Sequence, residues 1–150
     1  PGRRMRSLGR WSDPMLRVMD LGTRRQVKAL DVGTLSWDVA HDPRTRRVFV
    51  PKFITGQVLV IDDRQLTVKQ RWSAGFGARA VRLDLERRLL YVGAMYAGTV
   101  SVFNADTGQR LLRLRLGGHI KGLHLEPRTH KAYVGCDCGI FEIDGTKLGR

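Results

Sequence analysis

Three side chains with binding chemistry occupy one repeated position of this sequence. Trp37, Arg79 and Lys121 follow one another at steps of 42 residues. Tryptophan offers a flat stacking face, and arginine offers a planar fork that matches carboxylate and phosphate oxygens. If equivalent positions of a repeat meet in space, these residues would suit a small anionic or sugar-like ligand. The alternative is that exposed positions of an arginine-rich chain received them with no common role.

A second group with possible chemistry consists of Cys136, Cys138 and His119. Thiolates and imidazole nitrogens are ligands for zinc or copper. The chain has 2 cysteines, so no second pair completes the set, and structural or free thiols are the alternative. Cysteines two apart on an extended strand point to one face, about 6.6 to 7 Å apart, so a disulfide between them requires a turn.

Catalytic groups are sparse in the sequence. Asp42, Asp84 and Glu126 recur at steps of 42 residues, but each stands where a strand is expected to enter a turn, and acids there bond the turn backbone. The sequence has no phosphate-binding glycine loop, no nucleophile-elbow serine and no His-Glu-x-x-His pair. We therefore expect no catalysis within this segment and no cofactor.

The period of 42 residues also predicts the elements that position these side chains. Other columns that obey it include Gly33, Gly75 and Gly117, and Phe49, Tyr91 and Tyr133. Apolar residues alternate with arginine over 111–116, as the two-residue period of a strand requires. A repeat of about 40 to 45 residues with several short strands is typical of a β-propeller blade. The sequence predicts an all-β fold, a propeller fragment of about 3.5 four-stranded blades.

Each repeat is expected to contain four extended segments. The first segments are 37–42, 79–84 and 121–126, the second 46–50, 88–92 and 130–134, the third 58–62 and 100–104, and the fourth 69–74 and 111–116. We expect 1–15 to be a partial preceding blade or linker, and 16–144 to form blades in units of about 16–57, 58–99 and 100–139, with 140–150 starting a further blade. Because propellers usually carry four to eight blades, the chain is interpreted as a piece of a longer protein.

The chain is strongly basic, with 27 Lys and Arg against 14 Asp and Glu and a formal net charge of +13. Such a balance raises nucleic acid or an anionic membrane surface as partners. Many of the cations fall in predicted turns: Arg24, Arg25, Arg44, Arg46, Arg47, Arg64, Arg87, Arg88, Arg128 and Lys131. These turns lack the aromatic side chains that hold single strands by stacking, so we expect solvated turns and no specific nucleic-acid site. No apolar run reaches the roughly 18 to 20 residues that span a bilayer.

The repeat columns of two histidines predict the environments of their side chains. His41 shares its column with Leu83 and Leu125, so we expect it to lie in the packing between blades. His130 shares a column with Arg88 and is expected in a solvated turn.

Four stretches of the repeat share the pattern of a known family: 75–83, Leu89-Leu90-Tyr91-Val92-Gly93, 57–62 and 98–104. In these stretches the units resemble the YVTN-type β-propeller repeat of bacterial envelope proteins. The chain has Ser36, Ala78 and Ile120 at the proline of that repeat, and no unit has the asparagine that follows its Tyr-Val pair. The resemblance implies blades around a channel, ligand-binding loops on one face, and a periplasmic or extracellular location.

Two classes of function are expected. The first is a non-catalytic binding or scaffolding module, with a protein or a small anionic or sugar-like ligand at the channel mouth and the remaining blades of the parent chain as further partners. The second is part of a propeller enzyme, lactonase-like or resembling metal or haem oxidoreductases, with catalytic residues in other blades. Lactonase-like propellers use acids that converge around a divalent cation, and among the expected channel-mouth positions only Asp38 is an acid. The sequence therefore favours the binding module.

Overall fold

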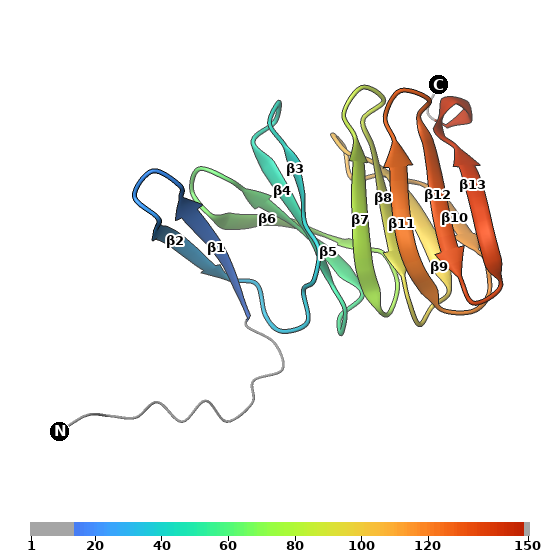
Figure 1. Ribbon diagram of the computed structural model, residues 1–150, viewed down its shortest axis with the longest axis horizontal. Coiled ribbons are helices and arrows are strands. Elements are labelled where there is room, and N and C mark those ends of the chain that lie inside the picture. Colours follow the sequence, from blue (N-terminus) through green and yellow to red (C-terminus); the bar gives the residue numbers. More distant parts are fainter. Residues whose placement is uncertain (1–13, 149–150) are drawn as a thin grey trace.

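Every sheet of the protein is an antiparallel meander, in which each strand pairs with the next strand along the chain. The structure is a computed structural model that describes residues 14–148. It contains four sheets of two, four, four and three strands, which stand side by side in Figure 1. This all-β arrangement is a partial β-propeller, as the sequence predicts.

The strands fall close to the expected segments. The first sheet contains β1 (Met15–Asp20) and β2 (Arg25–Asp31), and the second contains β3 (Ala40–Asp42), β4 (Arg47–Lys52), β5 (Gln57–Asp62) and β6 (Thr67–Ser73). The third sheet contains β7 (Ala78–Asp84), β8 (Leu89–Ala94), β9 (Thr99–Asn104) and β10 (Arg110–Arg115). The fourth contains β11 (Ile120–Glu126), β12 (Lys131–Cys136) and β13 (Gly139–Asp144), followed by a short 3₁₀ helix, η1 (Gly145–Lys147). By their place in the repeat, β1 and β2 are the third and fourth strands of a blade.

The unit boundaries expected from the sequence differ from the sheets. Strand β13 pairs with β12 along its whole length, so residues 139–144 belong to the sheet that β11 begins, whereas a new unit was expected to start at residue 140. The expected units begin at the third strand of each sheet, because a repeat has no marked start and only the hydrogen bonding decides which strands share a sheet. Most of the expected segment 1–15 lies outside the described residues, and its last residue, Met15, begins β1.

The first strand of the second sheet is shorter than expected. The ladder of β3 begins at Ala40, whereas extended structure was expected from Trp37. The side chain of Asp38 explains the difference, because its Oδ1 accepts from Val39 N at 2.9 Å and its Oδ2 from Val81 N of β7 at 3.0 Å. This segment is therefore held by a side chain that reaches the next sheet.

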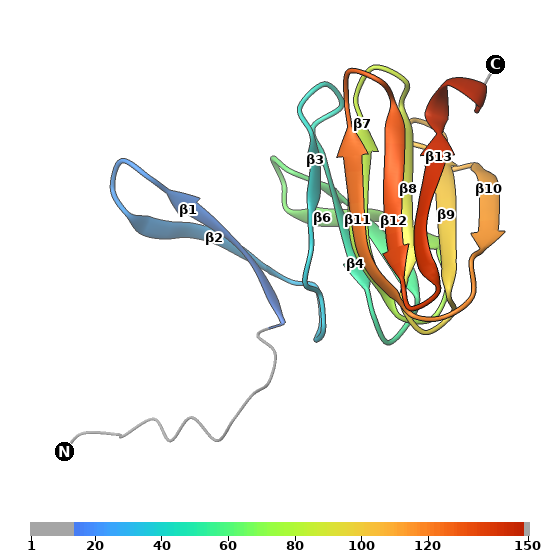
Figure 2. The same ribbon diagram turned by 45° about the vertical axis from the view of Figure 1, so that its right-hand side comes forward.

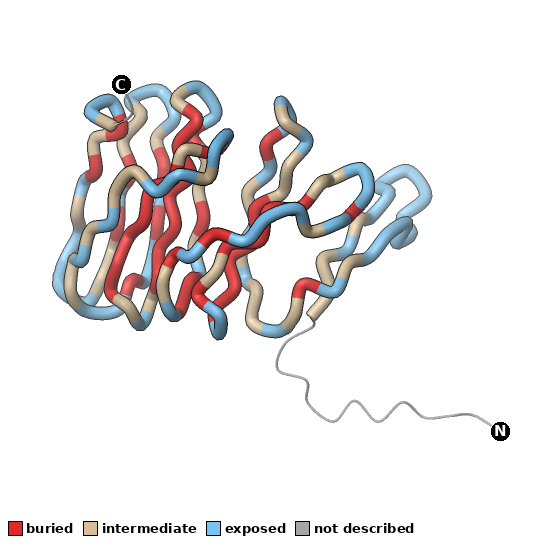
Figure 3. Tube along the Cα trace, turned by 180° about the vertical axis from the view of Figure 1, so that it is seen from behind, coloured by how far each residue is buried: buried red, intermediate tan, exposed pale blue. Residues whose placement is uncertain are grey.

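The core consists of three apolar clusters, one between each pair of neighbouring sheets. Trp72 lies between the second and third sheets, with ring centroids 5.5 Å from Phe49 and 5.6 Å from Phe103. Strand β8 is buried on both faces: Leu90 belongs to the cluster on one side and Leu89 to the cluster on the other. Figure 3 shows buried residues concentrated on these central strands, and Figure 2 shows the fourth sheet in front of the third. Burial between sheets explains why the strands read as near-continuous apolar runs.

The periodic acids close turns, as the sequence predicts, and two of them also join neighbouring sheets. Asp42 Oδ1 accepts from Arg44 N at 3.1 Å, and Asp84 Oδ1 accepts from Arg87 N at 3.0 Å. The other carboxylate oxygen of Asp42 accepts from Arg88 of the next sheet, and this arginine was wrongly expected to be solvated, since it is 8% exposed.

Both histidine expectations are wrong. His130 is mostly buried, and its Nδ1 lies 2.8 Å from Asp84 Oδ2 in the preceding sheet. His41 is exposed, and its Nε2 lies 2.8 Å from Asp63 Oδ2. The repeat column predicts the backbone position of each histidine, but the partner that the ring meets depends on the twist between sheets.

Candidate channel-mouth binding site

The structure brings the three predicted channel-mouth residues to one cavity. Trp37, Arg79 and Lys121 come from the segment before β3, from β7 and from β11, whose backbones lie next to one another. The cavity has a volume of about 290 Å³, and its lining is completed by Asp38, Ala80, Arg82, Gly122 and Leu123. It is small enough for one compact ligand group, such as a carboxylate-bearing or phosphate-bearing moiety.

Arg79 and Lys121, the two cations of the repeated position, each lie at a register shift in the strand pairing. The pairing of β7 with β8 shifts register between Ala78 and Ala80, and the pairing of β11 with β12 shifts between Ile120 and Gly122. The residue inside each shift is the cation. A bulge of this kind leaves one residue out of the ladder and re-aims its side chain. The two bulges therefore position these side chains at the cavity.

Arg79 lies over the ring of Trp37. The guanidinium carbon is 5.4 Å from the indole centroid, and Nη1 lies 3.6 Å from the sulfur of Met95. A cation–π contact of this length is worth about 0.5 to 1 kcal/mol at an exposed site. Neither the ring nor the sulfur neutralises the arginine, so its charge remains available to an anion.

The acid of the cavity is already engaged. Asp38 Oδ2 accepts from Arg82 Nη1 at 2.6 Å as well as from Val81 N at 3.0 Å. Arg82 also donates to Val81 O at 2.5 Å. Asp38 therefore joins the segment before β3 to β7, and its charge is offset by Arg82.

Lys121 shares a carboxylate with a histidine. Its Nζ lies 3.2 Å from Asp137 Oδ1, while His119 Nδ1 lies 3.0 Å from Asp137 Oδ2. Hydrogen bonds from Lys121 and then His119 lower the pKa of Asp137 below its ordinary value. The cavity thus has three cations in its wall, and Asp38 and Asp137 offset two of them.

Cys136 and Cys138 form a disulfide across the turn between β12 and β13. The sequence indicated that such a bond requires a turn, and the turn is present. Because both sulfurs are bonded to each other, the predicted zinc or copper group with His119 is not assembled in this state: His119 pairs with Asp137 instead. Across residues 14–148, no three His, Cys, Asp or Glu side chains are placed to hold a metal.

The sequence reasoning missed an aromatic patch beside the cavity, formed by Trp37, Phe53, Phe76 and Tyr96. The ring of Phe53 lies 4.9 Å from that of Trp37, 6.1 Å from that of Phe76 and 5.3 Å from that of Tyr96. Trp37, Phe76 and Tyr96 are 51%, 55% and 54% exposed. Phe53, Phe76 and Tyr96 fall in three different repeat columns, so no single column signals the patch.

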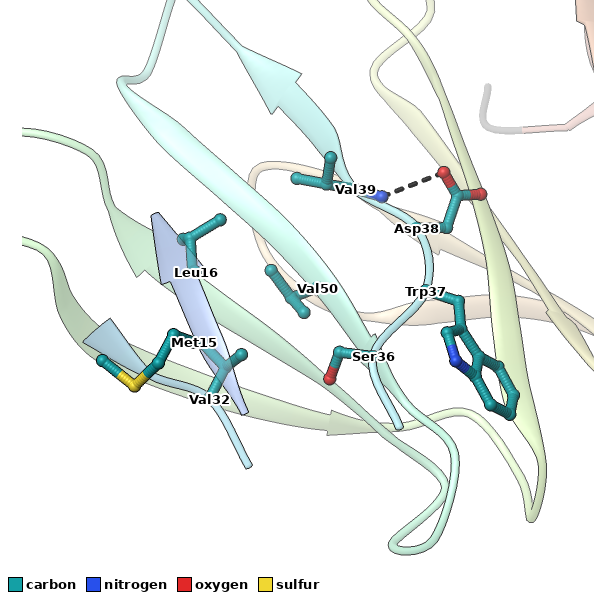
Figure 4. A pocket seen from close by; sticks show the side chains of 8 residues that line it. All are labelled: Met15, Leu16, Val32, Ser36, Trp37, Asp38, Val39 and Val50. Atoms are coloured by element: carbon teal, nitrogen blue, oxygen red, sulfur yellow. Dashed lines mark hydrogen bonds between the residues drawn. The ribbon is translucent and has the colours of Figure 1, made fainter. Parts of the chain in front are cut away.

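A second cavity adjoins the first on the side of β1. Its volume is about 230 Å³, and it is lined by Met15, Leu16, Val32, Ser36, Trp37, Asp38, Val39 and Val50. Figure 4 shows that the Trp37 ring points away from Leu16 and Val50. Because the lining is mostly apolar, this cavity suits an apolar group and not an anion.

Comparison with known proteins identifies the architecture. Similar solved structures include hydrazine synthase of Kuenenia stuttgartiensis, with a TM-score of 0.68 and 21% sequence identity over 77% of this chain and 35% of that one. Another is the dihydro-heme d1 dehydrogenase NirN in complex with DHE, with a TM-score of 0.75 and 16% identity over 88% of this chain and 30% of that one. Both are β-propeller proteins, and this chain spans about a third of the length of each.

No protein-family model and no curated protein sequence matches the chain. Within the described part of the chain, no helix is long and apolar enough to cross a membrane.

Proposed function

We propose that this chain is part of a binding or scaffolding propeller that holds an anionic ligand at the mouth of its channel. The observation that carries the proposal is the position of Arg79, which stacks on Trp37 at a cavity whose wall also contains Arg82 and Lys121. An arginine backed by an aromatic face offers its planar fork to a carboxylate or phosphate. Asp38 offsets Arg82 and Asp137 offsets Lys121, whereas Arg79 has no offsetting carboxylate among the described residues.

A binding role is favoured over catalysis at this site because its titratable groups are engaged in structure. Asp38 is held by Arg82 and by a backbone amide, and Asp137 is held by Lys121 and His119. A general base must reach a substrate proton, and neither carboxylate is free to do so. The chemistry that the cavity offers is charge recognition with a flat apolar wall.

The second candidate is part of a propeller enzyme whose catalytic residues lie in other blades. The likeness to hydrazine synthase and to NirN supports this candidate, although this chain covers 35% and 30% of those proteins. For both candidates we also propose a YVTN-type repeat and a periplasmic or extracellular location in a bacterium, on the basis of the sequence resemblance. Metal analysis and visible absorption of the parent protein separate the candidates, since an oxidoreductase would carry bound metal or haem.

The proposed function is tested by titrating the chain with citrate in a calorimeter. We expect saturable binding that weakens about tenfold in Arg79→Ala, equivalent to about 1.4 kcal/mol. Arg71→Ala is the matched control, because Arg71 is an exposed cation on β6 that does not line the cavity. Equal affinities in the two variants, or equal binding of neutral galactose, would reject the anion site.

A further inference from the structure

Of the aromatic patch, only Trp37 takes part in the anion site. The patch nevertheless exposes three large rings beside that site, those of Trp37, Phe76 and Tyr96. We propose that it is a docking surface for an acidic protein segment, which places an apolar side chain on the patch and a carboxylate in the cavity. This inference rests on the proposed function of the cavity, and it names the ligand as part of a protein partner.

The patch is built from loops that meet at one end of the sheets. Phe53 lies in the turn between β4 and β5, Phe76 in the loop between β6 and β7, and Tyr96 in the turn between β8 and β9. These connections lie at the lower ends of the sheets in Figure 1. Phe53 is buried at the centre of the patch, and Ile54 beside it in the chain is 55% exposed.

Backbone hydrogen bonds hold the loops of the patch together. Gly77 N donates to Phe53 O at 2.9 Å, Met95 N donates to Gly77 O at 2.8 Å, and Ala97 N donates to Phe76 O at 3.1 Å. The two residues that flank Phe76 are glycines with φ of +116° and +82°, a region that other residues rarely adopt. The patch is therefore pre-organised, which reduces the entropy lost when a partner binds.

The composition of the surface is typical of the energetic centre of a protein interface. Trp, Tyr and Arg dominate such centres, and they bind best where a well-packed apolar site can exclude water. Here Trp37, Tyr96 and Arg79 lie together around the buried ring of Phe53. Clustered exposed apolar side chains of this kind mark interaction sites in soluble proteins.

Charge on the surface selects an acidic partner. Arg79 has no offsetting carboxylate among its described contacts, and the chain as a whole carries a net charge of +13. A glycan would require acceptors as well as donors, but the carboxylates of Asp38 and Asp137 already accept from cations. The surface offers apolar rings and a donor, which match an apolar side chain next to Asp or Glu.

The ring geometry favours a protein segment over a nucleic-acid strand. Successive bases bind single-strand sites by stacking on open aromatic faces. The ring of Phe53 meets Trp37 at an interplanar angle of 64° and Tyr96 at 68°, so edges meet faces. Phe76 and Tyr96 are nearly parallel, at 19°, but they stack on each other. Because these rings pack against one another, the patch does not offer a row of open parallel faces for successive bases, and it suits an apolar side chain better.

The proposal is tested by selecting a random dodecapeptide display library on the whole chain, with counter-selection on the Phe76→Ser, Tyr96→Ser double variant. We expect the enriched peptides to combine an Asp or Glu with a nearby apolar residue. A synthetic enriched peptide should bind at least tenfold more weakly to the double variant and to Arg79→Ala. The double variant should keep its affinity for citrate, which shows that its fold and its cavity are intact.

Leu85→Ser is the matched control for removing an exposed apolar side chain, because Leu85 is 47% exposed in the turn between β7 and β8 at the other end of the sheet. Ile54→Ser is the milder variant, and a reduced peptide affinity is expected there too. Enriched peptides without acidic residues, or no enrichment over the double variant, would reject the docking surface. If the chain still binds citrate in that case, the cavity proposal stands. Tighter binding of oligogalacturonate or oligothymidylate than of any peptide would also overturn it. If the unmodified chain does not bind citrate, the cavity proposal is rejected, and the docking surface is then judged by the peptide results.

Discussion

Nδ1 of His130 lies 2.8 Å from Oδ2 of Asp84, and the two side chains are 17% and 2% exposed. This pair joins the turn that follows β7 to the start of β12 in the next sheet. Arg88 and Asp42 make the equivalent contact one sheet earlier. The same two repeat positions thus connect successive sheets at the end opposite to the aromatic patch, with a different cation in each case.

Replacing His130 by alanine should weaken the contact between the last two sheets. Asp84 would keep its bonds to the turn backbone but lose the partner of its buried Oδ2. We expect the free energy of unfolding in urea to fall by about 1 to 3 kcal/mol, the cost of leaving a buried polar group unsatisfied. His124→Ala is the control, since His124 is exposed on β11. An equal loss in the two variants would contradict the role of the contact.

Asp42 should make the protein sensitive to acid. Burial raises the pKa of Asp42, but hydrogen bonds from Arg88 and Thr45 outweigh it and lower the pKa to about 2. Because an unfolded aspartate has a pKa of about 3.9, the carboxylate stabilises the fold above about pH 4 and loses this effect as the pH falls toward about 2. The contribution is on the order of 2 kcal/mol.

The Asp42→Asn variant tests this dependence. We expect it to be less stable than the wild type at pH 7 and to lose less stability between pH 7 and pH 3. Urea unfolding at the two pH values measures both quantities. A variant that loses as much stability in acid as the wild type would show that Asp42 is not the group responsible.

Asp137 should oppose anion binding at the channel mouth. Its carboxylate offsets Lys121 and therefore reduces the positive potential of the cavity. We expect Asp137→Asn to bind citrate more tightly, by roughly two- to tenfold at about 20 mM salt and less at about 150 mM, because salt screens exposed charges. Lys121→Ala should lose less affinity than Arg79→Ala. Weaker citrate binding by Asp137→Asn would contradict this account.

The disulfide between Cys136 and Cys138 should add little to global stability. It closes a loop of three residues, and a loop that short removes little entropy from the unfolded chain, about 1.6 kcal/mol in the chain-entropy model. The double serine variant should therefore lose less than about 2 kcal/mol on urea unfolding. Alkylation with mass analysis should label both cysteines only after reduction. Labelling of the unreduced protein would show that the thiols are free.

The strand order and most strand positions could be predicted from the sequence because they depend on local pattern. Alternating apolar residues and a turn at every strand end specify a meander, and the period of 42 residues repeats it. The approach of Trp37, Arg79 and Lys121 could be predicted for the same reason, since equivalent positions of a ring of blades lie near one another. The residue at which each blade begins could not be predicted from the repeat, and the expected boundary at residue 140 cut through the last sheet.

Contacts between sheets depended on the tertiary structure. Phe53, Phe76 and Tyr96 come from three different repeat positions, so no column joins them, and only the convergence of three loops at one end of the sheets makes them a patch. His41 became exposed and His130 became buried although their columns indicated the reverse. The sequence by itself determined the repeated blade, because hydrogen-bonded meanders follow local alternation. The relative twist and spacing of neighbouring blades decided which side chains meet, because those contacts join residues that local pattern does not connect.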